Sequence, residues 1–231
     1  NWTDHVQQTG VTCYTCHRGQ NVPANIWFEE TGPETAARFA GWRNDQNSPI
    51  PATAYSDLPY DAFSEYLVGD ANIRVVGDTA LPTGAQGSSI HSTETTYSLM
   101  MHMSDSLGVN CTYCHNTRAM GEWSQSTPQR VTAWYGIRLA RDLNNDYLVP
   151  LGPVYPENRL GSTGDAPKAN CATCHAGVNK PLYGVSMLAD FPSLAGPTGG
   201  STAAAHGITL EGLAQADTEA AESAAPAGDS G

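Results

Sequence analysis

The six cysteines of this chain occur as three pairs of identical spacing, and a histidine follows each pair directly. The three C-x-x-C-H segments use every cysteine: Cys13, Cys16 and His17; Cys111, Cys114 and His115; Cys171, Cys174 and His175. In this pattern the two thiols add to the vinyl groups of a haem, and the adjoining imidazole becomes the proximal ligand of the iron. The sequence therefore predicts three covalent haem c sites.

Other chemistries of paired cysteines account for less of this pattern. A redox dithiol needs no histidine, and a histidine that follows all three cysteine pairs is too regular to be there by chance. A structural zinc site takes two pairs on one metal, and three pairs do not divide that way. A disulfide framework does not explain the histidine after every pair. Because covalent haem attachment takes place outside the cytoplasm, we expect the chain in the periplasm or on its membrane face.

The composition excludes one broad class of partner. The 231 residues contain 11 Lys and Arg against 23 Asp and Glu, a formal charge of −12. Nucleic-acid binding needs a basic face, so we expect no nucleic-acid partner. No stretch approaches the roughly 20 apolar residues of a membrane-spanning helix, and residues 1–20 lack the pattern of a signal peptide. We expect a mature or clipped soluble chain.

Two long helices are expected to position the second and third motifs. The first covers 94–108, with Ser92 and Thr93 as candidate caps and Gly108 in a left-handed terminal position. The second covers 128–143, with Thr127 as its cap and a proline at its first position, and we expect Asn144 and Asn145 to end it.

The rest of the chain is expected to consist of short helices and loops. Short helices are predicted at 33–42 and 59–68 and a short strand at 72–76, while 44–59 and 150–167 have loop composition. The predicted fold is mainly α with extensive loops, a multihaem cytochrome c chain wrapped around its covalently bound haems.

The sequence predicts one domain followed by a tail. Residues 1–195 form the multihaem cytochrome c domain. Residues 196–231 are rich in small and acidic side chains and contain no Lys or Arg, so we expect a flexible acidic C-terminal tail.

A six-coordinate electron-transfer haem needs a second axial ligand, usually Met or His. Met100 precedes Cys111 by eleven residues, about three helical turns, so it lies on the helix face that leads to this motif. Met103 shares that face, and spacing favours Met100 as the ligand. The alternative is that both methionines only fill the core.

The haem at Cys171 has no methionine on a preceding helix. His5 is the first candidate for its second ligand, ahead of His91, His102 and Met187. A haem with two histidines has a lower potential than one with His and Met. The alternative is that His5 is a polar surface residue.

The Cys13 haem has no evident second ligand. Only twelve residues precede Cys13, they contain no Met, and Trp2 occupies the position eleven residues upstream. Either this ligand comes from a distant part of the chain or the sequence begins too late to include it.

Two stretches, 97–118 and 164–185, closely resemble the tetrahaem cytochrome c subunit bound to the photosynthetic reaction centre of purple bacteria. The similarity covers roughly residues 1–195. By this resemblance the three motifs are the family's second, third and fourth haem sites. Met100 matches the methionine ligand of the third haem, and His5 matches the distal histidine of the fourth. The family's first motif and N-terminal anchor are absent from this sequence, which leaves two alternatives: three haems in all, or a fourth haem in a missing N-terminal part. The lack of a methionine ligand for the Cys13 haem favours the second.

The resemblance also implies a function and partners. Electrons pass from a soluble periplasmic donor, a cytochrome c2 or a high-potential iron-sulfur protein, through the haems to the photo-oxidised special pair. The subunit stands on the L and M subunits, on the periplasmic side of the photosynthetic inner membrane. The Cys111 and Cys114 haem is then nearest the special pair, the Cys171 haem is next, and the Cys13 haem lies farther out. On this basis the chain is an electron carrier and not an enzyme.

Two other functions remain open from the residues alone. One is a multihaem oxidoreductase with one open haem, for which the Cys13 site is the candidate. The other is a free periplasmic multihaem electron shuttle. In any of these proteins the haem propionates need basic partners, and four arginines are candidates: Arg118, Arg130, Arg138 and Arg141. The alternative for Arg138 and Arg141 is that they only cover the solvent face of their helix.

Overall fold

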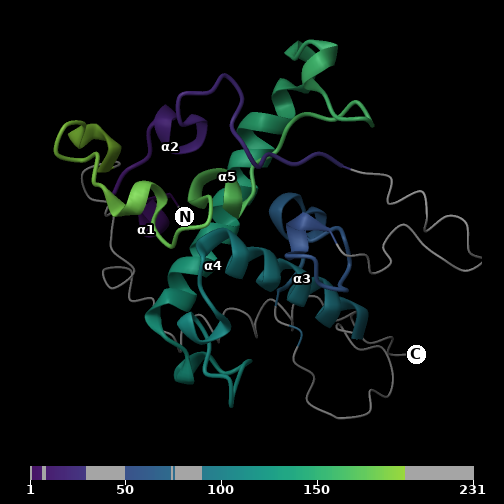
Figure 1. Cartoon of the computed structure of the whole chain (residues 1–231), viewed down its shortest axis with the longest axis vertical. Coiled ribbons are helices and arrows are strands. Elements are labelled where there is room, and N and C mark those ends of the chain that lie inside the picture. The colour runs from purple at the N-terminus through teal and green to yellow at the C-terminus, as the bar shows by residue number, and fades with distance from the viewer. Residues whose placement is uncertain (1, 7–8, 30–49, 74, 76–89, 196–231) are drawn as a thin grey trace, which may run out of the picture.

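The structure is a computed structural model that describes residues 2–6, 9–29, 50–73, 75 and 90–195. Over these residues the regular structure is almost entirely helical, which confirms a mainly α fold with extensive loops (Figure 1). The α-helices are α1 (Trp2–Val6), α2 (Cys13–His17), α3 (Ile90–Leu107), α4 (Pro128–Leu143) and α5 (Cys171–His175). No described helix is long and apolar enough to cross a membrane.

Short turns connect these helices. The 3-10 turns are Pro51–Thr53, Cys111–Tyr113, Trp123–Gln125, Val149–Val154, Glu157–Arg159, Pro181–Gly184 and Pro192–Ala195. Two turns, Ser64–Val68 and Asn144–Leu148, have π-helical hydrogen bonding. One antiparallel bridge joins Trp27 to Lys168.

Helix α3 starts earlier in the chain than its sequence predicts. It includes Ser92 and Thr93, so the prediction that these residues cap it is wrong. The hydroxyl of Thr95 donates to the carbonyl of His91 at 3.0 Å, which shows that helical geometry already holds there. The other end is as predicted: α3 ends at Leu107, and Gly108 has the left-handed φ of 63° that glycine adopts without strain.

Helix α4 has the predicted bounds but a different ending. Asn144 does not stop the chain's helical path, because a π-helical turn continues directly from it. Its side chain is fully buried and bonds backbone groups of Leu67 and Ala169, so packing keeps this residue within the helical path. At the other end the Thr127 hydroxyl donates to the carbonyl of Tyr113 at 2.6 Å, which ties α4 to the second motif.

The shorter predicted elements differ more. The helix predicted at 59–68 is reduced to the turn Ser64–Val68, since the Asp61 carboxylate accepts from the amides of Phe63 and Ser64 and starts the turn there. Asn72, Ile73 and Val75 are not in a strand, so that prediction is wrong for the described part of 72–76. The helix predicted at 33–42 and the tail at 196–231 lie outside the described residues.

The apolar core lies between α3, α4 and the segment 50–73. Its buried members are Trp27, Ala62, Phe63, Tyr66, Leu67, Leu99 and Ile137. Met100 and Met103 pack against this cluster while remaining partly buried themselves. The core thus fixes the face of α3 that carries both methionines.

Candidate haem sites

The second and third motifs each begin at a short helical turn whose preceding asparagine side chain accepts from a free amide of the turn. The Asn170 side chain accepts from the amide of Thr173 at 3.2 Å, and the Asn110 side chain accepts from the amide of Thr112 at 3.1 Å. Polar residues at this position stabilise helix starts. The turn that follows places both cysteines and the histidine of each motif on one short segment.

The three motif histidines are oriented in the same way. Nδ1 of each ring lies at hydrogen-bond distance from a backbone carbonyl that follows it: Gln20 for His17 (3.0 Å), Met120 for His115 (2.9 Å) and Val178 for His175 (3.1 Å). Because a carbonyl can only accept, Nδ1 must carry the proton. The neutral ring then has its lone pair on Nε2, the arrangement typical of a metal-bound histidine.

Burial favours the neutral form of the His115 and His175 rings. Burial, together with the nearby His5, lowers the pKa of His175 to about 4. Burial also lowers the pKa of His115. An iron ligand must be deprotonated at the coordinating nitrogen, so both rings are held in the form that binds metal.

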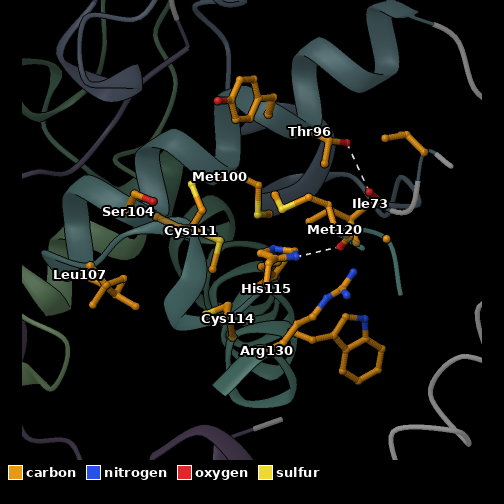
Figure 2. Close-up of a pocket in the computed structure, with 18 of the residues that line it drawn as sticks. Ile73, Thr96, Met100, Ser104, Leu107, Cys111, Cys114, His115, Met120 and Arg130 are labelled. Carbon is orange, nitrogen blue, oxygen red and sulfur yellow. Dashed lines mark hydrogen bonds between the residues drawn. The ribbon is translucent and has the colours of Figure 1, made fainter. Parts of the chain in front are cut away.

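The second motif opens onto a cavity of about 340 Å³ (Figure 2). Its lining includes Cys111, Cys114 and His115, and Met100 and Met103 of α3. The structure brings both methionines to the site, so the preference for Met100 stays a prediction from spacing.

Two polar groups also reach this largely apolar cavity. The indole Nε1 of Trp123 is buried without a hydrogen-bond partner, and the Arg130 guanidinium lies 4.1 Å from the centre of the Trp123 ring. A buried donor without an acceptor is costly. A haem with acidic propionates fits this cavity, because it offers acceptors to both groups and buries its apolar faces against the methionines.

At the third motif the structure brings together two histidines from opposite ends of the described chain. The rings of His5 on α1 and His175 on α5 have centroids 6.0 Å apart and an interplanar angle of 65°. Two imidazoles on opposite sides of one metal, each with a bond of about 2 Å and a ring centre about 1 Å further, have centroids about 6 Å apart. The separation fits a bis-histidine haem.

The other candidates for this iron lie elsewhere. His102 is engaged at both nitrogens, by the carbonyl of Ala52 at 2.9 Å and the hydroxyl of Ser106 at 3.1 Å. His91 lies on the exposed first turn of α3. The Met187 sulfur accepts from the Thr12 hydroxyl, beside the first motif.

The third motif contacts both of the others. Sγ of Cys174 lies 3.2 Å from Sγ of Cys16, and Arg18 donates to the carbonyl of Cys174 at 3.0 Å. On the other side the amide of Gly177 donates to the carbonyl of Ser106 at 2.8 Å, close to the second motif. Helix α5 accordingly lies between α2 and α3 in Figure 1.

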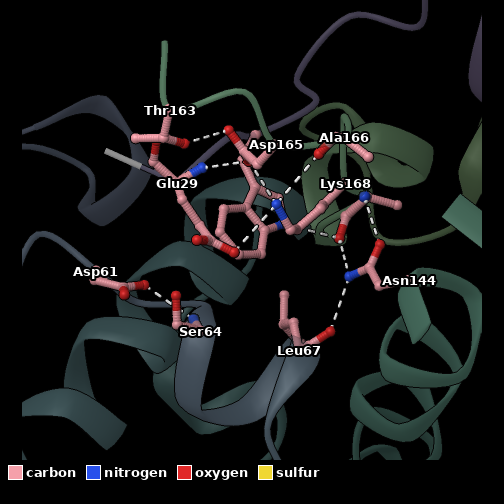
Figure 3. A network of polar contacts seen from close by, with 11 residues as sticks. Glu29, Asp61, Ser64, Leu67, Asn144, Thr163, Asp165, Ala166 and Lys168 are labelled. Atoms are coloured by element: carbon pink, nitrogen blue, oxygen red, sulfur yellow. Dashed lines mark hydrogen bonds and ion pairs between the residues drawn. The ribbon is translucent and has the colours of Figure 1, made fainter. Parts of the chain in front are cut away.

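A buried polar network holds the segment that enters α5 (Figure 3). The Lys168 ammonium, with a side chain only 3% exposed, lies 2.5 Å from the Asp165 carboxylate and 3.4 Å from that of Glu29. The backbones of Lys168 and Trp27 exchange two hydrogen bonds of 3.0 Å. The network attaches the segment after the first motif to the segment before the third.

Asn144 makes the second connection to this segment. Its amide donates to the carbonyls of Leu67 and Ala169 at 2.9 and 3.0 Å, and its oxygen accepts from the amide of Ala169 at 2.8 Å (Figure 3). One side chain therefore joins α4, the core and the entry to α5.

The four candidate arginines occupy different environments. Arg130 lines the cavity of the second motif. Arg141 donates to the carbonyl of Tyr66 at 3.1 Å, and the Arg138 guanidinium lies 4.5 Å from the centre of the Trp134 ring. Arg118 is exposed. Of the four, Arg130 is the one at a candidate haem cavity.

Sequence reasoning overlooked two features of these sites. It did not include the approach of Cys16 to Cys174, which no sequence spacing indicates. It also gave no role to Gly136, although a glycine in the interior of a predicted helix is a recognisable signal. A side chain at 136 would meet the ring of His5.

Paired thiols beside a neutral histidine held through Nδ1, repeated along a helical chain, define a cytochrome of the c type. The chain belongs to the family of photosynthetic reaction centre cytochrome C subunits, whose sequence model matches residues 1–195. This confirms the resemblance, and membership implies covalently bound haem c.

Three curated relatives carry the name photosynthetic reaction center cytochrome c subunit. The protein of Rubrivivax gelatinosus is 53% identical over 193 residues, that of Thermochromatium tepidum 47% over 194, and that of Roseobacter denitrificans 46% over 206. Each match covers 84% of this chain but only 53%, 47% and 54% of the respective relative. The chain thus spans about half the length of these relatives.

Proposed function

We propose that this chain is part of an electron-transfer subunit of the photosynthetic reaction centre. It passes electrons from a soluble periplasmic donor through c-type haems to the photo-oxidised special pair. The observation that carries this proposal is the set of three C-x-x-C-H segments in a chain that matches named reaction-centre cytochrome subunits over 84% of its length. Bound haem supplies reversible one-electron chemistry at iron.

The residues of the chain have defined roles in this proposal. Three pairs of thiols form the thioether links: Cys13 and Cys16, Cys111 and Cys114, Cys171 and Cys174. Three histidines bind iron through Nε2: His17, His115 and His175. Met100 and His5 are the second ligands at the second and third motifs.

The order of the sites follows the family resemblance, and the contacts between the motifs support the middle position of the Cys171 site. We place the Cys111 site nearest the special pair, the Cys171 site next and the Cys13 site farthest out. The Cys171 motif supports this order because it bonds to the second motif's helix through Ser106 and approaches the first motif through Cys16. A site that contacts both others belongs between them.

The partners are those of a membrane-bound photosynthetic complex. The subunit associates with the L and M subunits on the periplasmic side of the photosynthetic inner membrane. Its donor is a cytochrome c2 or a high-potential iron-sulfur protein, and the formal charge of −12 favours steering of a basic donor. The subunit carries electrons and is not an enzyme by itself.

Flash spectroscopy of reaction centres purified with the complete subunit tests this function. A flash is expected to oxidise a haem in step with re-reduction of the special pair. Replacing Cys111 and Cys114 with alanine is expected to abolish the fast re-reduction phase, because the nearest haem is then missing. Carbon monoxide binding to the reduced parent protein would indicate an oxidoreductase with an open haem. Recovery of the complete subunit in the soluble fraction would indicate a free shuttle.

A further inference from the structure

The ring of His5 lies directly against the backbone of α4, at the one position where the helix has no side chain to obstruct it. A Cβ built on Gly136 would lie 2.6 Å from Cε1, 2.9 Å from Nδ1 and 3.1 Å from Nε2 of His5. The first two separations are shorter than the contacts that real Cβ atoms make, and the third is tighter than most of them. Any residue other than glycine at 136 would therefore displace the ring.

The same turn of α4 also orients the ring. Nδ1–H of His5 donates to the carbonyl of Thr132 at 2.8 Å. In α-helical geometry this carbonyl also accepts from the amide of Gly136, four residues later. The ring is thus seated on one helical turn, with Nδ1 as a donor and Nε2 left for a metal.

The ring also lies close to the histidine of the third motif. The centroid separation of 6.0 Å between His5 and His175 matches two imidazoles on one metal. Displacement of the ring by a methyl group would change this separation and break the bond to Thr132. Because an iron–nitrogen bond tolerates little extension, the ligand would be lost or weakened.

The backbone at this position does not require glycine. Gly136 lies inside α4 and has an ordinary helical φ. Alanine forms helices better than glycine at such a position. Helix stability alone therefore favours alanine, and the contact with His5 is the feature that glycine serves.

We propose that Gly136 is the positioning residue that seats His5 as an axial ligand of the Cys171 haem. The inference rests on the proposed function, since it takes a haem at Cys171 and His5 as its ligand. The inference goes beyond the proposed function because it assigns the placement of His5 to one turn of α4.

The test uses Gly136→Ala in the complete haem-loaded subunit within purified reaction centres. We expect an unchanged haem content and about one haem per subunit that becomes high-spin and binds carbon monoxide when reduced. The midpoint potential of the Cys171 haem should shift while that of the Cys111 haem stays at the parent value. Added imidazole should restore the low-spin spectrum, which a general loss of structure would not allow.

Three variants separate the possible outcomes. Gly152→Ala is the matched control, because its Cβ would meet only Cβ of Ala166 at an ordinary 3.8 Å, and it should retain the parent spectra. His5→Ala should give the same open haem as Gly136→Ala. In the double variant the ring is gone, so alanine at 136 should add no further effect to His5→Ala.

These outcomes distinguish the inference from the function on which it rests. If His5→Ala leaves every haem low-spin, the ligand assignment in the proposed function is wrong. If His5→Ala opens the haem but Gly136→Ala matches the parent, the role of Gly136 is overturned and the ligand assignment stands. If Gly136→Ala fails to assemble while the double variant assembles, the clash with the ring is established.

Discussion

The candidate second iron ligands of the second and third motifs come from different distances along the chain. At the second motif, Met100 and Met103 lie on α3, the helix that leads directly to Cys111. At the third motif, His5 comes from the first helix of the chain and reaches His175 only because α1 packs on α4. A local donor depends on secondary structure, whereas a remote donor depends on the whole tertiary fold.

This difference extends to the surroundings of the two sites. The second motif faces a largely apolar cavity, and its helix packs on the core. The third motif is entered through a buried ion pair and a fully buried asparagine. We therefore expect perturbations of buried polar groups to affect the third site selectively, and the predictions below test this expectation.

Met100→Ala should produce the largest change, confined to the local site. The Cys111 haem should become high-spin and bind carbon monoxide. Its midpoint potential should fall by about 0.1 V, a small part of the roughly 0.8 V range that axial ligands set. Met103→Ala is the matched control and should stay low-spin. Redox titration with optical spectra measures both, and the reverse result would make Met103 the ligand.

Asp165→Asn should lower the stability of the region around the third motif. It leaves the buried Lys168 ammonium without its nearest carboxylate, and breaking a buried pair costs about 3 kcal/mol. Glu29→Gln should cost less than about 1 kcal/mol, because Glu29 is 54% exposed and its carboxylate lies 3.4 Å away. Chemical denaturation followed at each haem band measures the difference. Equal losses at both haems would contradict a selective effect.

Asn144→Leu should destabilise the same region by about 2 kcal/mol. The substitution retains volume but leaves buried backbone groups of Leu67 and Ala169 without partners. Asn145→Leu is the control, since Asn145 is exposed and its amide donates to the carbonyl of Val68. Thermal unfolding of the two variants gives the comparison, and similar melting temperatures would show that Asn144 is not a key connection.

Acid should lower the stability of the region around the third motif before that of the second motif. Of the four predictions, this one has the smallest expected effect. Burial alone would raise the pKa of Asp165, but hydrogen bonds from Lys168, the amide of Glu29 and the hydroxyl of Thr163 outweigh it and lower the pKa below the ordinary 3.8. The unfolded carboxyl then binds protons at higher pH than the folded one. The stabilisation is complete above the ordinary pKa and is lost as pH falls through the folded value.

The measurement for this fourth prediction is unfolding free energy as a function of pH. The parent should lose stability below about pH 4, within the range of an ordinary carboxyl pKa. Asp165→Asn should lack this contribution because asparagine does not titrate there. If the unfolding free energy of the variant changed with pH as steeply as that of the parent, the pH dependence would come from other carboxyl groups.

Sequence alone predicted the local features of this molecule well. Proline at the start of α4 and the left-handed glycine after α3 fixed two helix ends, because capping and backbone preferences act over a few residues. The position of Met100 at the second motif follows from helical spacing. These features need no information about distant parts of the chain.

The features that failed or stayed open depend on tertiary contacts. His5, His91 and His102 were nearly equivalent in the sequence, and only the packing of α1 on α4 separates them. Asn144 has the composition of a helix stop, yet its buried hydrogen bonds keep it in the helical path. The sequence predicted the chemistry of each side chain, but it did not predict which partner each side chain contacts.

The motif histidines are oriented by backbone carbonyls, so substitutions of the residues that carry these carbonyls do not remove the hydrogen-bond acceptor. Gln20, Met120 and Val178 have nothing in common as side chains, but each contributes the same backbone oxygen. Substitution at these positions leaves the acceptor in place. The carbonyl follows its histidine by three residues in the first and third motifs and by five in the second, so the path of the backbone, and not one loop length or one side chain, sets the orientation of the ring.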